Sequence, residues 1–172
     1  MKPLVFNSTS LIYLTKLGLS KVLEDLKDEK ITSPEAKREV VNEGKRKDLS
    51  DAVVLEKLFS NKVKQAVEPK DKELLSRLLR SRGLRVTDAE VLALARELDG
   101  LAVMDDEVAR KTAKVYDIIY VGTPYVLVRA VLEGLISKEK VKQAVNELVF
   151  AGWRCSIESY AKIMDIVDKL VS

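Results

Sequence analysis

Short apolar segments alternate along this chain with longer segments that carry the spacing of amphipathic helices. Each apolar segment ends abruptly at polar residues or glycine, and the three clearest cover residues 4–6, 101–104 and 118–121. Short apolar strands separated by helices are typical of a parallel sheet that is buried on both faces. We therefore expect one domain over residues 1–172 with an α/β fold, in which three layers (α/β/α) surround a central twisted parallel sheet of about four or five strands.

Helix signals separate the predicted strands. Ser33 followed by Pro34 is typical of a helix start, with serine as the cap and proline in the first turn. Gly18 predicts the end of the first helix, and the alternation over residues 63–67 predicts a further strand. The expected helices cover residues 11–17, 19–26, 34 onward, 48–59, 70–81, 87–98, 107–116, 124–133, 138–150 and 157–170, and the last two belong to the same domain.

The composition excludes several kinds of active site. The 172 residues include no histidine and one cysteine, Cys155, which removes Ser-His-Asp and Cys-His catalysis, imidazole-based zinc sites and an intrachain disulfide. The first apolar run is too short for a signal peptide, and no apolar stretch approaches the ~20 residues that a membrane span needs. We expect a cytoplasmic protein without an organic cofactor, whose chemistry rests on carboxylates, lysines, hydroxyls and hard metal ions.

Polar side chains follow two of the predicted strands directly. Asn7 ends the first strand, and Asp105 and Asp106 end a later one. Open parallel sheets bind ligands beyond the carboxyl ends of their strands, where the strand order reverses. The two aspartates can therefore be ligands of a magnesium ion, or they can cap the following helix and stabilise its dipole.

Two further acidic positions lie on predicted helices. Thr87 and Glu90 form the Thr-x-x-Glu pattern of a capping box, which assigns Glu90 a structural role. Asp88 is not needed by that box, so it is either a first-turn acid that stabilises the helix dipole or a site residue. Glu39 lies beside the apolar stripe of its helix, so its carboxylate either borders the stripe or points into a cleft.

Two basic clusters are candidate phosphate-binding surfaces. Four arginines between residues 77 and 85 carry their charges over a stretch without acids, and residues 45–47 form a second cluster in a predicted loop. Both clusters can contact an RNA backbone, and both can be ordinary solvated surface, because the net charge of the chain is only +3. The candidates for RNA contact are Lys45, Arg46, Arg82 and Arg85.

In their order and spacing, the segments described so far resemble the PIN-domain family of metal-dependent ribonucleases. The resemblance rests on residues 7–14, on Glu39, on residues 88–90 and on residues 104–106, and it extends through Gly122-Thr123 into the C-terminal tail. The prokaryotic branch, which includes VapC-type toxins and uncharacterised archaeal proteins, is the most similar. The family's fold, a twisted parallel sheet between helices, agrees with the pattern of strands and helices above.

The resemblance also implies a role for individual acids. It makes Glu39, Asp88 and Asp106 the second, third and fourth acids of a site for one or two Mg²⁺ or Mn²⁺ ions, and Asp105 lies next to the fourth. Such a site needs no histidine, as this composition requires.

At the first acidic position, this sequence departs from the family pattern. Asn7 stands where the family usually has aspartate, and Ser10 replaces a common proline. An amide oxygen can still ligate a hard cation, but it carries no charge. Thr9 would be the hydroxyl residue that supports this first position. Losing one negative charge weakens metal binding and the activation of water.

Two functions of different classes follow. The first is a Mg²⁺- or Mn²⁺-dependent endoribonuclease, in which ions held by Asp88, Asp106 and Asp105, with Glu39 and Asn7 at the same site, activate water for attack on a phosphodiester. The second is a PIN-fold module that binds RNA or protein without turnover. The family further implies a homodimer and, for a toxin, a small antitoxin protein as partner. A flavodoxin-like nucleotide binder would share the sheet, but the sequence contains no phosphate-binding loop.

Overall fold

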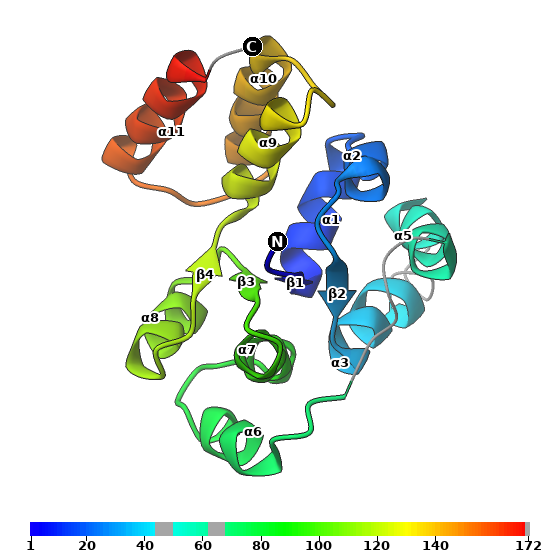
Figure 1. Ribbon diagram of the computed structural model, residues 1–172, viewed down its shortest axis with the longest axis vertical. Helices are drawn as coiled ribbons and strands as arrows, with labels where there is room; N and C mark the ends of the chain where they lie inside the picture. Colours follow the sequence, from blue (N-terminus) through cyan, green and yellow to red (C-terminus); the bar gives the residue numbers. More distant parts are fainter. Residues whose placement is uncertain (44–49, 62–67, 171–172) are drawn as a thin grey trace.

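The computed structural model describes residues 1–43, 50–61 and 68–170 and contains one parallel sheet (Figure 1). In the described residues its strands are β1 (Leu4–Phe6), β2 (Lys30–Thr32), β3 (Leu101–Val103) and β4 (Tyr120–Val121), in the order β2-β1-β3-β4. The central strand β1 pairs Val5 with Ile31 on one side and with Ala102 on the other. The strand expected over residues 63–67 lies outside the described residues.

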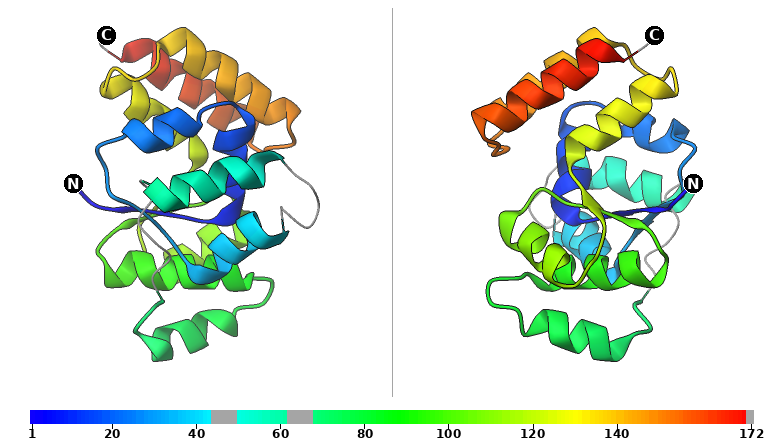
Figure 2. Two further views of the ribbon diagram at one scale, coloured as in Figure 1. Left: turned by 90° about the vertical axis from the view of Figure 1, so that its right-hand side faces the viewer. Right: turned by 60° about the vertical axis from the view of Figure 1, so that its left-hand side comes forward.

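Helices cover both faces of this sheet. Successive strand residues point to opposite sides, so each face carries apolar side chains that must be buried. Leu4, Phe6 and Val103 belong to one apolar cluster, whereas Val5 and Ala102 belong to a second. Figure 2 shows α6 and α7 on one side of the strands and α9 and α10 on the other. The first cluster packs against α1 (Ser8–Lys16), α2 (Ser20–Asp25), α5 (Ser50–Asn61), α9 (Thr123–Leu132) and α10 (Lys138–Phe150), and the second against α6 (Lys72–Leu79), α7 (Val86–Glu97) and α8 (Glu107–Val115).

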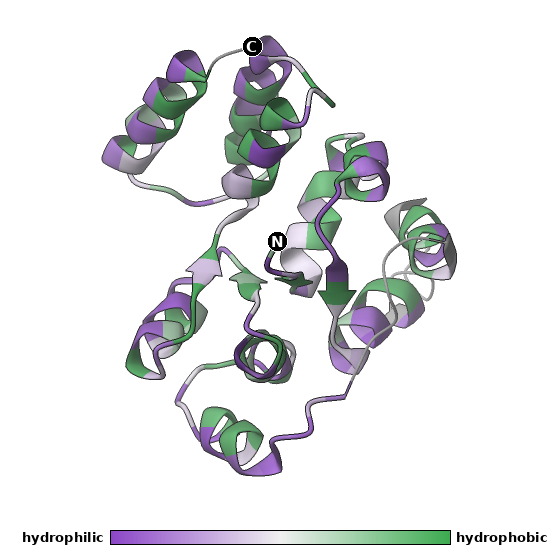
Figure 3. Cartoon of the chain, viewed as in Figure 1, coloured by the Kyte–Doolittle hydropathy of each residue, from purple (hydrophilic) through white to green (hydrophobic). Residues whose placement is uncertain are grey.

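The colouring by hydropathy agrees with this layered core. In Figure 3 the strands β1 and β3 carry hydrophobic residues, and the helices around them alternate between hydrophobic and hydrophilic faces. The three-layer α/β/α architecture with a parallel sheet is therefore confirmed. The last helix, α11 (Ile157–Lys169), buries only Val167 and lies beside α10.

Several helix boundaries follow from the expected local signals. Ser33 accepts a hydrogen bond from the backbone N–H of Ala36, and Pro34 opens α3 (Pro34–Lys37). Gly18, after the end of α1, has φ +67°, a conformation that glycine adopts without steric cost. The helix α3 continues directly as the π-helix η1 (Arg38–Glu43), which carries Glu39 in its first turn.

Strand β2 was not expected, because only its central residue is apolar. The two flanking residues are nevertheless buried and use their polar atoms internally. Thr32 donates from Oγ1 to the carbonyl oxygen of Phe6 at 2.8 Å, and the Lys30 ammonium donates to the carbonyl oxygen of Leu26. An apolar pattern cannot identify a strand whose polar side chains are buried and paired.

The predicted capping box at the start of α7 is wrong. The helix begins at Val86, one residue before Thr87, whose buried hydroxyl has no hydrogen-bond partner among the described residues. Glu90 instead accepts a hydrogen bond at Oε2 from the backbone N–H of Glu35, at 3.1 Å. Glu90 therefore still has a structural role, but the role is to fasten α7 to the segment that leads to Glu39.

The strand order of the sheet reverses between β1 and β3. From β1 the chain continues to β2 on one side, and it later returns to β3 on the other side. Asn7 follows β1 directly, and Asp105 and Asp106 follow β3 after Met104. These polar residues therefore meet where the strand order reverses, which is the usual ligand position of an open parallel sheet.

Candidate active site

Asn7 and Asp88 form the buried centre of the site. Asn7 is fully buried and caps α1, because its Oδ1 accepts a hydrogen bond from the backbone N–H of Ser10 at 3.0 Å. Its Nδ2 donates to Oδ1 of Asp88, also at 3.0 Å. The amide oxygen is thus engaged by the helix, and the amide N–H group faces the carboxylate. In this arrangement Asn7 supports Asp88 through its amide N–H group, and its oxygen caps α1.

Arg85 is the cation of the site. Its Nε donates to Oδ2 of Asp88 at 2.9 Å, and its Nη2 lies 3.4 Å from Oδ1 of the same carboxylate. The Asp88 side chain is only 1% exposed, whereas that of Arg85 is 44% exposed. Nη2 also contacts Oγ1 of Thr9 at 3.3 Å, so Thr9 holds the guanidinium and is not bonded to Asn7.

Glu39 reaches the same guanidinium from a different element. Its Oε1 lies 3.5 Å from Nη1 of Arg85, and its Oε2 accepts a hydrogen bond from Oγ of Ser8 at 3.0 Å. The side chain therefore points into the site and does not merely border the apolar stripe. Ser8, which the sequence analysis did not select, orients this carboxylate from the first turn of α1.

Asp106 is the third acid near this site, and it also caps a helix. Its Oδ1 accepts a hydrogen bond from the backbone N–H of Ala109 at 2.9 Å, so Asp106 is the N-cap of α8. Its charge also acts on Arg85. Burial lowers the pKa of Arg85, but the hydrogen bond and charge of Asp88, together with the charges of Glu39 and Asp106, outweigh this effect and raise the pKa above that of free arginine. Asp88 and Glu39 thus contact one cation, and the charge of Asp106 acts on the same cation.

Asp105 is directed to different partners. Its Oδ2 accepts from Oγ1 of Thr123 at 2.5 Å, and its Oδ1 accepts from the backbone N–H of Thr123 and from Nη2 of Arg110. Gly122 permits this close approach, since a Cβ there would lie 2.8 Å from Oδ1 of Asp105. Both carboxylate oxygens therefore have protein partners, and Asp105 fastens the start of α9 to α8. Only the Gly122-Thr123 pair signalled this arrangement in the sequence.

The chemistry of the acidic set fits a divalent cation. Asp88, Glu39 and Asp106 supply the carboxylate oxygens that Mg²⁺ and Mn²⁺ prefer, and the guanidinium of Arg85 already takes the place of a cation among them. No group of three acids is arranged to hold a metal ion in the part of the chain that the structure describes. Arg85 bridges Asp88 and Glu39 there, so an incoming ion and the guanidinium compete for the same carboxylates.

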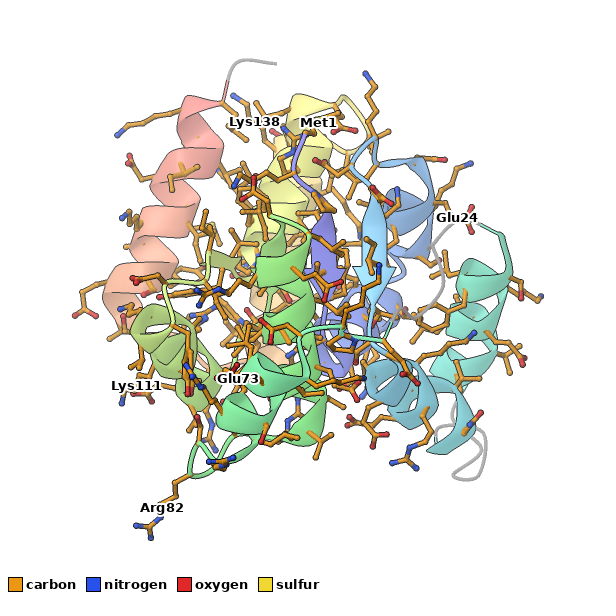
Figure 4. All side chains as sticks on the ribbon, turned by 60° about the horizontal axis from the view of Figure 1, so that its bottom comes forward. Met1, Glu24, Glu73, Arg82, Lys111 and Lys138 are labelled. Atoms are coloured by element: carbon orange, nitrogen blue, oxygen red, sulfur yellow. The ribbon has the colours of Figure 1, made fainter. Side chains whose placement is uncertain are left out.

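The expected RNA-binding residues separate into three groups. Lys45 and Arg46 lie outside the described residues. Arg82 is exposed and points away from the body of the molecule (Figure 4). Arg85, the third, is paired with the acids, so its charge is available to a phosphate only if it leaves Asp88 and Glu39.

A cavity of about 1110 Å³ adjoins this site. Thr9, Arg85 and Asp106 line it at the carboxyl edge of the sheet, and residues of α9, of the segment 152–156 and of α11 line it farther away. The cavity also contains Tyr13. Burial raises the pKa of Tyr13, the charge of Asp105 raises it further, and the charge of Arg154 opposes this shift. Tyr13, Asp105 and Arg154 are therefore close enough to interact electrostatically.

The comparisons with known proteins identify the family of the chain. No curated protein matches the sequence. A family model described as DUF3368, a PIN domain, matches residues 3–169. The match includes every element of the parallel sheet and all the acids described above, and PIN domains generally use divalent metal ions. The chain therefore belongs to the PIN-domain family, whose fold is of the nuclease type.

Proposed function

We propose that this PIN domain is a divalent-metal-dependent endoribonuclease that hydrolyses RNA phosphodiester bonds. The observation that carries the proposal is that Asp88 and Glu39 contact one cation, Arg85, at the carboxyl edge of the sheet, where the charge of Asp106 also acts on it. Asp88, Glu39 and Asp106 would hold Mg²⁺ or Mn²⁺, which when bound supplies Lewis acidity and a water of lowered pKa.

The chain's own residues have separate tasks in this reaction. Asn7 fixes the orientation of the buried Asp88 carboxylate through its Nδ2, and Ser8 fixes that of Glu39. The Arg85 side chain is 44% exposed, so solvent and an incoming ligand can reach its guanidinium. An RNA phosphate is anionic, like the Asp88 carboxylate, and it can accept two hydrogen bonds from this guanidinium. The arrival of substrate would therefore draw Arg85 away from the carboxylates that it occupies without RNA.

The test is cleavage of a labelled mixed-sequence RNA in the presence of Mn²⁺, Mg²⁺ or EDTA. Asp106→Asn removes the charge but keeps an oxygen that can cap α8, so the fold is preserved. We expect cleavage to fall at least ~10-fold, since even groups that only orient a metal ligand contribute ~10–100-fold. Asp71→Asn is the matched control, because Asp71 caps α6 through the backbone N–H of Leu74 in the same way.

Two results would contradict this proposal. One is equal cleavage by wild type, Asp106→Asn and Asp71→Asn. The other is cleavage that persists in EDTA, which would assign the activity to a contaminant or to metal-free chemistry.

A second candidate function is a PIN-fold module that binds RNA or protein without cleavage. The observation in its favour is that Asn7 and Arg85 together satisfy both oxygens of Asp88 without any metal ion. This function predicts RNA binding that is unaffected by EDTA and no cleavage by wild type with either ion. Cleavage by an Asn7→Asp variant, against a silent wild type, would decide in its favour.

Partners are a separate proposal. A homodimer and, if the protein is a toxin, a small antitoxin protein remain predictions from family resemblance. Phe150 at the end of α10 is 92% exposed and Ile157 at the start of α11 is 84% exposed, so apolar surface is present there for a partner. The inner face of α10 is buried in the core, however. Among the described residues, no helix has the length and apolar character to cross a membrane.

A further inference from the structure

Glu39 is held in the site by contacts to its side chain and to its backbone segment. Its Oε1 lies 3.5 Å from Nη1 of Arg85, and its Oε2 accepts a hydrogen bond from Oγ of Ser8 at 3.0 Å. The backbone contact comes from Glu90, whose Oε2 accepts a hydrogen bond from the backbone N–H of Glu35 at 3.1 Å. Glu35 lies in the first turn of α3, and Glu39 follows four residues later. Glu90 therefore acts about one helical turn away from the Glu39 carboxylate.

The segment that carries Glu39 is short and irregular. The helix α3 has only four residues and continues as the π-helix η1, whereas isolated helices shorter than ~12–15 residues are marginal in water. The first N–H groups of a helix have no partner within it, and Glu90 accepts the hydrogen bond of the Glu35 N–H. Its own helix, α7, is buried along most of its length and packs against α3 (Figure 1). The contact thus anchors the Glu39 segment to a helix of the core.

Glu90 is not placed to share an ion with Asp88. It lies two residues after Asp88 on α7, and residues two apart on a helix do not face each other. The Glu90 carboxylate contacts α3, whereas the Asp88 carboxylate contacts Asn7 and Arg85. Any effect of Glu90 on the site must therefore pass through the segment that carries Glu39.

The proposed function makes this contact more important. In that reaction Arg85 leaves the two carboxylates for an RNA phosphate, so the ion pair between Arg85 and Glu39 is lost. Ser8 then orients the Glu39 side chain from α1, and Glu90 fixes the backbone of its segment relative to α7, which carries Asp88. Groups that orient a metal ligand without touching the metal contribute ~10–100-fold to metal affinity or activity.

We propose that Glu90 is a positioning residue for the metal ion of this site. By holding the backbone N–H of Glu35, it sets the separation of Glu39 and Asp88 at which both carboxylates bind one divalent cation. The proposal rests on the proposed function, because it concerns the same ion. It assigns to Glu90 a share of the metal affinity in addition to its share of the stability of the fold.

The experiment is a calorimetric titration of the full chain with Mn²⁺ in the absence of RNA, which measures metal affinity and not cleavage. Glu90→Ala removes the acceptor, and we expect the affinity for Mn²⁺ to fall at least ~10-fold. Glu90→Gln keeps an oxygen at the same reach without the charge and should bind nearly as tightly as wild type. Glu90→Asp keeps the charge but is one methylene shorter, so it should lose most of the affinity that Glu90→Ala loses. The same titrations in the Arg85→Gln background remove the competing guanidinium.

Glu97→Ala is the matched control. Glu97 lies on the same helix, is also partly buried, and accepts a hydrogen bond at Oε2 from the backbone N–H of Lys70 at 2.8 Å. Loss of either glutamate's hydrogen bond should lower the melting temperature by about 2–4 °C. Glu97→Ala should nevertheless leave the affinity for Mn²⁺ unchanged, because its bond fastens the segment that leads to α6 and not the one that carries Glu39.

A double-mutant cycle tests the route through Glu39. Glu39→Ala removes the carboxylate that Glu90 positions. Adding Glu90→Ala to this variant should therefore weaken Mn²⁺ binding by no more than ~2-fold further, which is within the scatter of additive effects.

The proposal is overturned if Glu90→Ala binds Mn²⁺ as tightly as Glu97→Ala, if Glu90→Asp binds more tightly than Glu90→Gln, or if the losses from Glu39→Ala and Glu90→Ala add. Cleavage of RNA with Mn²⁺, measured in parallel, separates this failure from that of the proposed function. Unchanged Mn²⁺ affinity in Glu90→Ala beside metal-dependent cleavage by wild type refutes the positioning role alone. Mn²⁺ binding that depends on Glu90, without cleavage by wild type, refutes the nuclease alone. If neither wild type nor Arg85→Gln binds Mn²⁺, both are refuted.

Discussion

Replacing Arg85 with glutamine tests whether the guanidinium neutralises the acidic site. The substitution leaves the Asp88 carboxylate, 1% exposed, with Asn7 as its one remaining side-chain partner among the described residues. Breaking a fully buried ion pair costs about 3–5 kcal/mol, and because Arg85 itself is 44% exposed, solvent screening reduces this to about 2 kcal/mol. At ~2–4 °C per kcal/mol for a chain of this size, we expect the melting temperature in EDTA to fall by about 4–8 °C.

Mn²⁺ should raise the melting temperature of the Arg85→Gln variant. With Arg85 removed, Asp88 and Glu39 are free to receive an ion, and a ligand present at 100 times its dissociation constant stabilises the folded state by about 2.7 kcal/mol. The melting temperature of Arg85→Gln should therefore rise more with Mn²⁺ than that of wild type, in which the ion must first displace the guanidinium. Thermal unfolding followed by circular dichroism, with and without Mn²⁺, measures both effects.

The control for this experiment is Arg77→Gln. Arg77 pairs with Glu73 on the surface of α6, where the two side chains are 62% and 77% exposed, so its loss should change stability by less than about 0.5 kcal/mol. If Arg85→Gln melts like Arg77→Gln in EDTA, and Mn²⁺ raises neither variant above wild type, then the guanidinium does not compete with a cation and the reasoning is refuted.

Two further substitutions probe the buried contacts. Asn7→Asp places a second carboxylate 3.0 Å from Asp88, so denaturation in EDTA should show a loss of about 1–3 kcal/mol that Mn²⁺ reverses; a loss that Mn²⁺ leaves unchanged would argue against an ion at this position. Gly122→Ala brings a Cβ to 2.8 Å from Oδ1 of Asp105, a carboxylate that Thr123 holds in place, and should cost about 1–3 kcal/mol in urea unfolding; unchanged stability would show that Asp105 is not held by this close approach.

The fold was predictable wherever the buried residues are apolar and the exposed residues are polar. The strands β1 and β3 are apolar and stop at polar residues, so their positions and the polar residues that follow them could be located from the sequence. Strand β2 could not, because Lys30 and Thr32 are buried through hydrogen bonds to the backbone, and no apolar pattern records such bonds.

The site was predictable in its acids but not in its pairing. Asp88 and Glu39 do meet, at Arg85, yet Arg85 was assigned to RNA alone. Its position three residues before Asp88, at the N-cap of α7, could have indicated that ion pair. The contact between Arg85 and Glu39 could not be foreseen, since it depends on how η1 and α7 pack, which Glu90 secures through the backbone of Glu35.

The hydrogen bond between Asn7 and Asp88 joins residues 81 positions apart. Contacts between such distant segments require the closure of a long loop. They are slow to form, because the chain loses conformational entropy before the contacts stabilise it. The first strand leaves the ribosome long before the helix that carries Asp88, so the growing chain has its acids on separate segments. The proposed nuclease site is therefore incomplete while the chain is still being synthesised beside the RNA that encodes it.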